Sequence, residues 1–365
     1  MSKLTYKGED LFVLIFIASL IFSGFINPNA KTVNYIGAYF LIFIFEYLIL
    51  KGAIYKNINI NELLKVNMIA IIFLGIFIIL EFSLNYYLGI NIQDFLPRSR
   101  MNTAIYGGIF PRSYGFATEP GVAAFYFNTL GPIGLWYLWK KERIKKYKKL
   151  ILSIIVTVAF ITTFSSAGIV FFILSFLIVS LLNLHRISRK KIRLKRVINL
   201  IPILLFIMIT LAFNLEIINK FEAFINPILS KMSLNTQVGS VSDRLSRWER
   251  GLDSIKDKPI FGSGLGSTTL SGYGSSTNWY MFLTVETGLI GILPVLIFLV
   301  LIFIRLMKSK NESRNIYLFS FIAGILHFSV ISTFYHPFLW LLIIIFYFDN
   351  DSYKRRKKCE NMNVL

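Results

Sequence analysis

The sequence has 365 residues, of which 55% are apolar and 16% are charged, and its mean hydropathy is +0.63. A water-soluble domain of this size could not bury so much apolar surface, so the composition excludes an ordinary soluble protein. The net charge of +20 does not indicate a nucleic-acid partner, because the cationic clusters at 140–149, 186–196 and 354–358 each border an apolar run, where they would anchor a membrane protein on anionic lipid.

The apolar runs predict an all-α fold, a polytopic transmembrane helical bundle of about ten spans. A helix needs about 20 residues to cross about 30 Å of hydrocarbon, and unpaired backbone groups exclude irregular structure there. The stretch 150–184 is counted as two spans, because Ser165-Ser166-Ala167-Gly168 offers a hairpin tip. The predicted spans cover residues 11–26, 34–50, 66–88, 120–139, 150–164, 168–184, 198–213, 279–304, 316–334 and 338–349.

The distribution of lysine and arginine predicts that both termini are cytoplasmic. With the amino terminus inside, the cytoplasmic segments hold 28 of the 39 cationic residues, as short cytoplasmic loops usually do. The chain is then a single integral membrane domain, 1–365, with a basic cytoplasmic tail at 350–365. The lone cysteine, Cys359, lies in that tail, so no intrachain disulfide can brace the outer loops.

Two outer segments, 89–118 and 214–278, are longer than simple connections need to be, and long ordered loops usually carry function. The first leads through Arg112 to Glu119-Pro120, where a span begins. Glu119 has two interpretations: it stabilises the positive end of the helix dipole, or it faces Arg112 and takes a proton from a sugar hydroxyl. Arg98 adds positive charge nearby.

The larger outer segment begins with a helical pattern of apolar residues from Ile217 to Leu229, which predicts a helix on the outer membrane surface or packed against neighbouring spans. A second helix is predicted to be capped by Ser242 or Asp243. Its spacing places three further side chains on one face: Arg244, Arg247 and Trp248. Guanidinium groups suit the phosphates of lipid-linked diphosphates, although pairing with Asp243, Glu249 or lipid headgroups would also explain them.

Other polar groups gather near the late spans. Gly262, Gly264 and Gly266 resemble a phosphate-binding loop only weakly, since no strand precedes them, and we expect a tight loop that returns the chain to the next span. Glu286 is either a functional acid or paired within the bundle, and His336 is either structural or catalytic.

In chain order, these features resemble the O-antigen polymerase and ligase superfamily, whose Wzy-type members polymerise lipid-linked oligosaccharide repeat units. The resemblance covers roughly residues 95–305, and its last two stretches are the most specific. Four stretches carry it: Arg112-x-x-Gly115-x-x-x-Glu119-Pro120; Ser165-Ser166-Ala167-Gly168; Arg244-x-x-x-Trp248 followed by Pro259-Ile260-Phe261-Gly262-x-Gly264-x-Gly266; and Asn278 followed by Glu286-Thr287-Gly288-Leu289-Ile290-Gly291.

The resemblance implies a metal-independent membrane glycosyltransferase of the bacterial cytoplasmic membrane that uses no cofactor. Its substrate would be a polyprenyl-diphosphate-linked oligosaccharide, and its partners would be membrane lipids and, as further candidates, a chain-length regulator and a flippase. Ligase-type relatives tend to carry a histidine just before the asparagine that opens the late span, whereas this chain has Thr277 before Asn278. That departure favours a polymerase over a ligase.

The hypothesis for the site assigns diphosphate binding to arginines and base catalysis to Glu119 or, alternatively, His336. Diphosphate would be held by Arg98, Arg112, Arg244 and Arg247, with Trp248 and Asn278 as further substrate contacts. The competing classes are a flippase or permease, whose inverted repeats and midplane charges we do not find in the sequence, and a non-catalytic scaffold, which leaves the arginine, tryptophan and glycine pattern unexplained.

Overall fold

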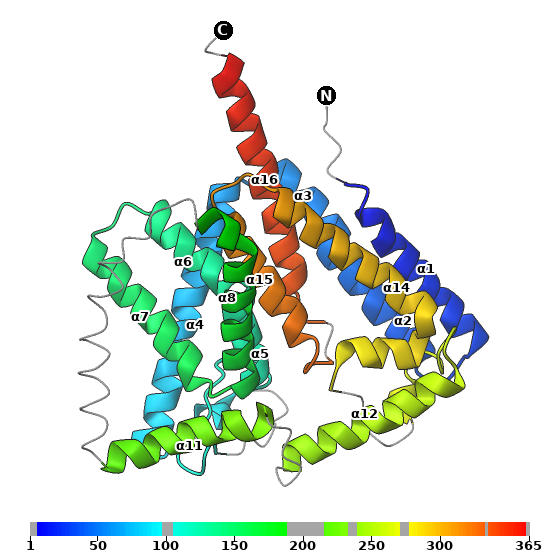
Figure 1. The fold of residues 1–365 in the computed structure, drawn as a ribbon, viewed down its shortest axis with the longest axis horizontal. Coiled ribbons are helices and arrows are strands. Elements are labelled where there is room, and N and C mark those ends of the chain that lie inside the picture. Colours follow the sequence, from blue (N-terminus) through cyan, green and yellow to red (C-terminus); the bar gives the residue numbers. More distant parts are fainter. Residues whose placement is uncertain are drawn as a thin grey trace.

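The computed structural model describes residues 6–96, 105–187, 215–232, 239–270, 277–332 and 335–362. Within these segments the secondary structure is helical, with one isolated bridge between Tyr106 and Phe110, so the predicted all-α class is confirmed (Figure 1). The predicted span at 198–213 and the candidate Arg98 lie outside the described residues.

The first half of the chain forms helices at each predicted span. α2 runs into the π-helical turns of Leu41–Ile49 and on into α3, giving one long helical rod. The predicted span 120–139 is divided into α5 and α6 at Leu130, because Pro132 has no N–H to continue the ladder of helical hydrogen bonds. These helices are α1 (Asp10–Ile26), α2 (Thr32–Phe40), α3 (Leu50–Asn57), α4 (Ile60–Leu88), α5 (Pro120–Thr129), α6 (Gly131–Lys140), α7 (Lys146–Thr162) and α8 (Ser166–Ile187).

In the second half, α16 is longer than the predicted 338–349 and continues into the basic tail. The helices are α11 (Leu215–Met232), α12 (Gly239–Asp257), α13 (Ser267–Leu270), α14 (Trp279–Lys308), α15 (Arg314–His327) and α16 (Phe338–Met362). In the described segments, four helices are long and apolar enough to cross a membrane, namely Thr32–Asn57, Ile60–Leu88, Ser166–Asn183 and Trp279–Lys308. The count of ten spans remains a prediction.

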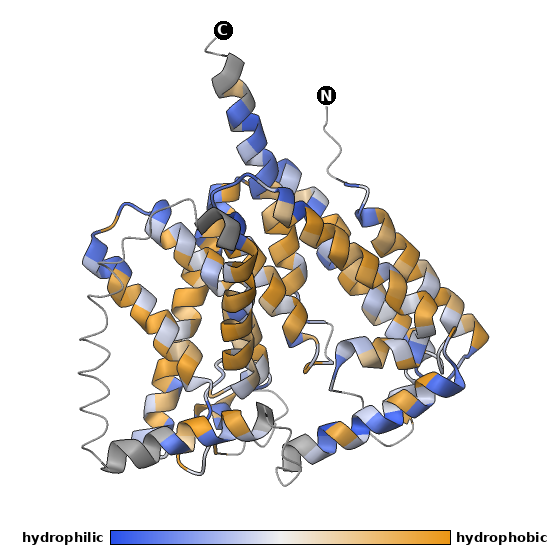
Figure 2. Cartoon of the chain, in the orientation of Figure 1, coloured by the Kyte–Doolittle hydropathy of each residue, from blue (hydrophilic) through white to orange (hydrophobic). Residues whose placement is uncertain are grey.

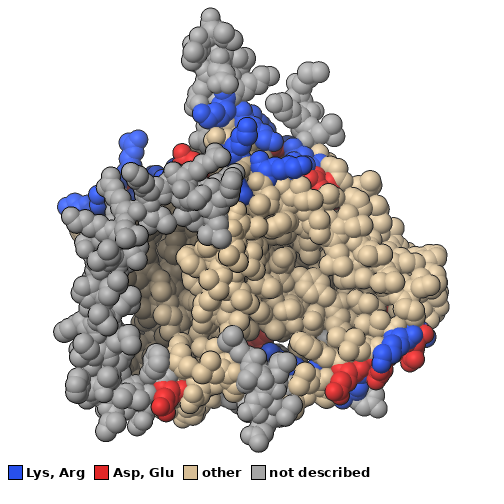
Figure 3. Space-filling view, in the orientation of Figure 1, with Lys and Arg blue, Asp and Glu red and all other residues tan. Residues whose placement is uncertain are grey.

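The helices are arranged as a bundle with two different ends. The start of α1 and the end of α16 lie at one end, and α11 and α12 lie across the other (Figure 1). Figure 2 shows apolar residues along the bundle and hydrophilic residues at its ends. In Figure 3 lysine and arginine gather where α16 leaves the bundle, whereas α12 carries both signs of charge. This distribution is the one expected of a membrane protein whose ends lie on the same side.

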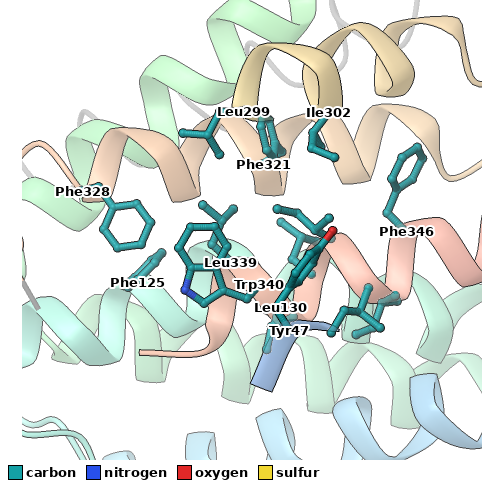
Figure 4. Close-up of a cluster of buried hydrophobic side chains, with 14 of the residues drawn as sticks. Tyr47, Phe125, Leu130, Leu299, Ile302, Phe321, Phe328, Leu339, Trp340 and Phe346 are labelled. Carbon is teal, nitrogen blue, oxygen red and sulfur yellow. The ribbon is translucent and has the colours of Figure 1, made fainter. Parts of the chain in front are cut away.

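The first half of α16 forms the centre of the bundle. Trp340 is 1% exposed, and its ring centroid lies 4.7 Å from that of Phe43 and 5.9 Å from that of Phe328. Figure 4 shows Trp340 in the cluster of buried side chains that includes Phe328 and Leu339. Trp279, at the start of α14, packs on Phe328 at 4.7 Å. This segment is short for a lipid-facing span, and protein surrounds it on several sides: it packs on α4, α5, α15 and the π-helical turns of Leu41–Ile49.

The loop at 259–266 is inserted into a break in α14. Gly288 has φ of 64° inside that helix, so the backbone groups on either side of it bond to the loop instead of to the helix. Ser263 N donates to Val285 O at 2.8 Å, and Leu289 N donates to Pro259 O at 2.9 Å. The positive φ values of Gly262, Gly264 and Gly266 agree with the expected tight loop, but the insertion of this loop into α14 was not expected.

Glycine is required on both sides of this junction by direct backbone contact. A Cβ on Gly262 would lie 2.4 Å from the carbonyl carbon of Glu286, and one on Gly288 would lie 2.2 Å from Ile260 O. Because backbone atoms rather than flexible side chains fill the space, neither contact can be relieved without moving a chain segment.

We predict that Gly262→Ala destabilises the protein more than Gly89→Ala. Both glycines have positive φ, 70° and 68°, but no atom lies within 4 Å of a Cβ built on Gly89. In Gly89→Ala the free energy of unfolding should fall by only about 1–2 kcal/mol, the cost of a positive φ for a residue with a Cβ. In Gly262→Ala it should fall further, because the new Cβ also pushes the loop away from α14. Melting temperatures of the purified variants in detergent measure the difference, and equal losses would show that the inserted loop contributes nothing to stability.

Candidate functional site

Three charged residues from distant parts of the chain meet at the end of the bundle covered by α11 and α12. Arg112 lies in the segment before α5, Glu119 is the N-cap residue of α5, and Arg244 lies in α12. All three are half-buried, and Glu119 interacts electrostatically with both arginines. In the described part of the chain no ion pair within 4 Å joins them, so their charges are close without direct contact.

The protonation of these groups reflects competition between burial and charge. Burial raises the pKa of the Glu119 carboxyl, and the nearby Arg112 and Arg244 guanidinium groups oppose that rise, with a net value above that of an ordinary glutamate. Burial likewise lowers the pKa of both arginines, and the Glu119 carboxylate opposes this effect. The carboxylate is consequently a stronger base than an exposed glutamate.

The local backbone leaves the Glu119 side chain available. Pro120 occupies the first turn of α5, as predicted, and Glu119 has an extended backbone at the N-cap. Its carboxylate makes no capping hydrogen bond to the helix. Glu119 therefore stabilises α5 only through the attraction between its negative charge and the positive end of the helix dipole.

A buried carboxylate that the sequence analysis did not assign a role, Glu81, holds the backbone two and three residues after Arg112. Glu81, in the last turns of α4, is 1% exposed and accepts hydrogen bonds from the backbone N–H groups of Tyr114 and Gly115, at 3.2 and 2.7 Å. Gln93 donates to the other carboxylate oxygen and also to Gly115 O. The sequence could have pointed to Glu81, because an acid within a predicted span needs a partner.

The predicted hairpin at 165–168 supports the same region. α7 ends at Thr162 and α8 begins at Ser166, which confirms two helices there. The buried Tyr106 accepts a hydrogen bond from Ser166 Oγ at 3.3 Å and donates to Phe224 O of α11 at 2.9 Å. The amphipathic helix predicted at 217–229 is thus present as α11, and it packs on the membrane helices.

In α12, the predicted arginine–tryptophan face is helical, but its predicted cap is wrong. The helix begins at Gly239, so Ser242 and Asp243 lie inside it. Arg247 pairs with Asp243, with 3.0 Å between Nε and Oδ1, which is the alternative interpretation given to the arginines. Half-buried Trp248 has its indole Nε1 buried without a hydrogen-bond partner among the described residues.

The remaining candidates have different surroundings. Asn278 caps α14 by accepting from Met281 N at 3.2 Å. Glu286 is fully buried beside the break in α14 and accepts from Thr268 Oγ1 at 2.7 Å, which is the structural alternative expected for it. His336 is 8% exposed and stacks on Phe338, and burial lowers its pKa to about 4.

Tyrosines form another side of the site, and the sequence analysis missed them. Burial raises the pKa of the Tyr335 hydroxyl, and Glu119 and Tyr35 add to that rise, so this side chain lies near both residues. Its ring is 50% exposed. Tyr35 of α2 is hydrogen-bonded to Thr269 next to the glycine loop. No sequence signal distinguished these two among the 18 tyrosines.

A family model described as O-antigen ligase matches residues 150–296 of the chain. The matched region runs from α7 into α14 and contains Arg244, the glycine loop and the break at Gly288. Arg112 and Glu119 precede it. No curated protein matches the sequence.

Proposed function

Because the chain belongs to the O-antigen polymerase and ligase superfamily, we propose that it polymerises oligosaccharide repeat units carried on polyprenyl diphosphate. The reaction would take place at the outer face of a bacterial cytoplasmic membrane, on a ten-span protein with both ends inside. The observation that supports this most strongly is the approach of Arg244, inside the matched family region, to Arg112 and Glu119, which precede that region.

In the proposed reaction the two arginines hold the diphosphate of the growing chain. As the bond between the anomeric carbon and the phosphate oxygen breaks, negative charge accumulates on the diphosphate, and guanidinium groups stabilise that charge without a metal. The buried Nε of Arg112 has no hydrogen-bond partner in the described segments, so it can donate to a phosphate oxygen. Trp248 and Arg247, which is paired with Asp243, would border this diphosphate.

Glu119 would act on the incoming unit. Its carboxylate accepts the proton of an acceptor sugar hydroxyl while that oxygen attacks the anomeric carbon, so the configuration there is inverted. The raised pKa of Glu119 favours it over His336, whose pKa of about 4 makes the imidazole a weak base. The exposed ring of Tyr335 near Glu119 would provide a surface for the acceptor sugar.

A ligase that transfers the glycan to a lipid or protein acceptor is the second candidate, supported by the description of the matching family model. The presence of Thr277 where ligase-type relatives tend to have histidine argues against it. Its hydroxyl is buried without a partner among the described residues, but a threonine hydroxyl is not a base at neutral pH.

We predict that Arg244→Ala reduces chain elongation at least about 100-fold, as removal of one transition-state donor does. Purified protein would be given lipid-linked repeat units, and glycan length and released polyprenyl diphosphate would be measured. Arg250→Ala, an exposed site in the same helix, is the matched control and should keep wild-type rates.

Two other outcomes of that assay would be decisive. Wild-type chain lengths in Arg244→Ala, with normal membrane insertion, would remove this arginine from the mechanism. If wild-type protein elongated no lipid-linked chain but transferred single glycans to an added acceptor lipid, the ligase alternative would replace the polymerase.

The pH dependence of elongation should report Glu119. The rate should fall as the pH drops through the raised pKa of its carboxyl, because only the carboxylate accepts a proton. Arg244→Gln removes a charge that lowers this pKa, so the acidic limb of its residual activity should move to higher pH, whereas Arg244→Lys should leave the limb near the wild-type position. An identical limb in all three proteins would mean that another group titrates.

A further inference from the structure

A cavity lies at the end of the bundle opposite to the proposed glycosyl-transfer site. It has a volume of about 790 Å³ and lies where the ends of α14 and α16 meet. Five of its lining residues are cationic and come from two helices and the turn after α14: Arg305, Lys308, Lys310, Lys354 and Lys357. Figure 3 shows this gathering of positive charge where α16 leaves the bundle.

The cavity keeps a net positive charge although it contains an acid. Glu9 also lines it, but this carboxylate pairs with Arg305, with 2.6 Å between Oε1 and Nε. The four lysines that line the cavity, Lys308, Lys310, Lys354 and Lys357, therefore give it a net positive charge that attracts an anion. The floor is held in place by a hydrogen bond of 2.8 Å from Ser309 Oγ to Asn350 Oδ1, which joins α14 to α16.

An apolar track leads to this cavity along one face of α14. Its members recur at helical spacing and are each 40–55% exposed, and Ile304 both ends the track and lines the cavity. Leu301 lines the cavity beside it. The track consists of Leu289, Leu293, Leu296, Ile297, Val300 and Ile304.

A cationic cavity at the end of an exposed apolar track matches one kind of molecule, an amphiphile with a phosphate head and hydrocarbon chains. We propose that the cavity binds the phosphodiester headgroup of an anionic glycerophospholipid, with its acyl chains on the α14 track. Lys308 of α14 and Lys354 and Lys357 of α16 face the headgroup from two helices, whereas a general attraction of cations to the membrane surface requires no cavity. This binding is independent of the proposed glycosyl transfer.

The test measures the thermal stability of the purified full-length protein in neutral detergent during lipid titration. Phosphatidylglycerol should raise the melting temperature saturably, and phosphatidylcholine with the same chains should not. Lys308→Gln/Lys354→Gln should weaken the apparent affinity for phosphatidylglycerol at least about tenfold. Lys146→Gln/Lys148→Gln, in another exposed cationic cluster, is the control and should bind as the wild type does.

Two more probes distinguish the lipid from its headgroup and from loss of folding. Glycerophosphoglycerol, which has no acyl chains, should bind far more weakly, and Ile304→Asn should weaken binding of the intact lipid while keeping the lysines. Equal binding of glycerophosphoglycerol, equal loss in the control pair, or unchanged affinity in both Lys308→Gln/Lys354→Gln and Ile304→Asn would each overturn the proposal. If the double variant does not fold, Ile304→Asn decides alone.

Discussion

The insertion of the 259–266 loop into the break of α14 is the constraint on which the rest of the outer end depends. α12 ends just before this loop, so the bonds between the loop and the residues around Gly288 fix where α12 lies relative to α14. Thr268, at the end of the loop, is bonded to Glu286 from the same break. Arg244 reaches the neighbourhood of Glu119 because its helix is held in this way. The two stretches that carry the family resemblance most specifically are thus one structural unit.

A second constraint is the burial of charge where the bundle meets the outer segments. A buried acid without a partner is costly, and Glu81 avoids the cost by accepting backbone N–H groups next to Arg112. Glu119 is different, because its carboxylate has arginines nearby but no direct ion pair among the described residues. The bonds of Glu81 fix the backbone at Tyr114 and Gly115. The charges of Glu119 and its two arginines remain available to a ligand. In this account one glutamate, Glu81 of α4, contributes to stability, and another, Glu119 at the start of α5, contributes to the chemistry.

The fold could be predicted from the sequence wherever the signal was local. Long apolar runs predicted the helices, the tip at 165–168 separated α7 from α8, and helical spacing predicted α11 and placed Arg244 and Trp248 in a helix. Features that depend on distant contacts could not be predicted in this way. The break at Gly288, the role of Glu81 and the approach of Tyr335 to Glu119 each arise from segments far apart in the chain. The roles given to the site residues remain proposals for the same reason, since a spacing reveals a helix face and not what binds to it.

The central claim, that Arg112 and Arg244 work on the outer side of the membrane, is tested most directly by thiol labelling with a reagent that does not cross membranes. Cysteines would be introduced at Thr118 and Glu249, exposed polar positions near Glu119 and Arg244, in a Cys359→Ser background. The account predicts that both are labelled in intact cells or spheroplasts, while the native, exposed Cys359 of the unaltered protein is labelled only after permeabilisation. Labelling of Thr118→Cys or Glu249→Cys only after permeabilisation would place the arginines in the cytosol and contradict the account.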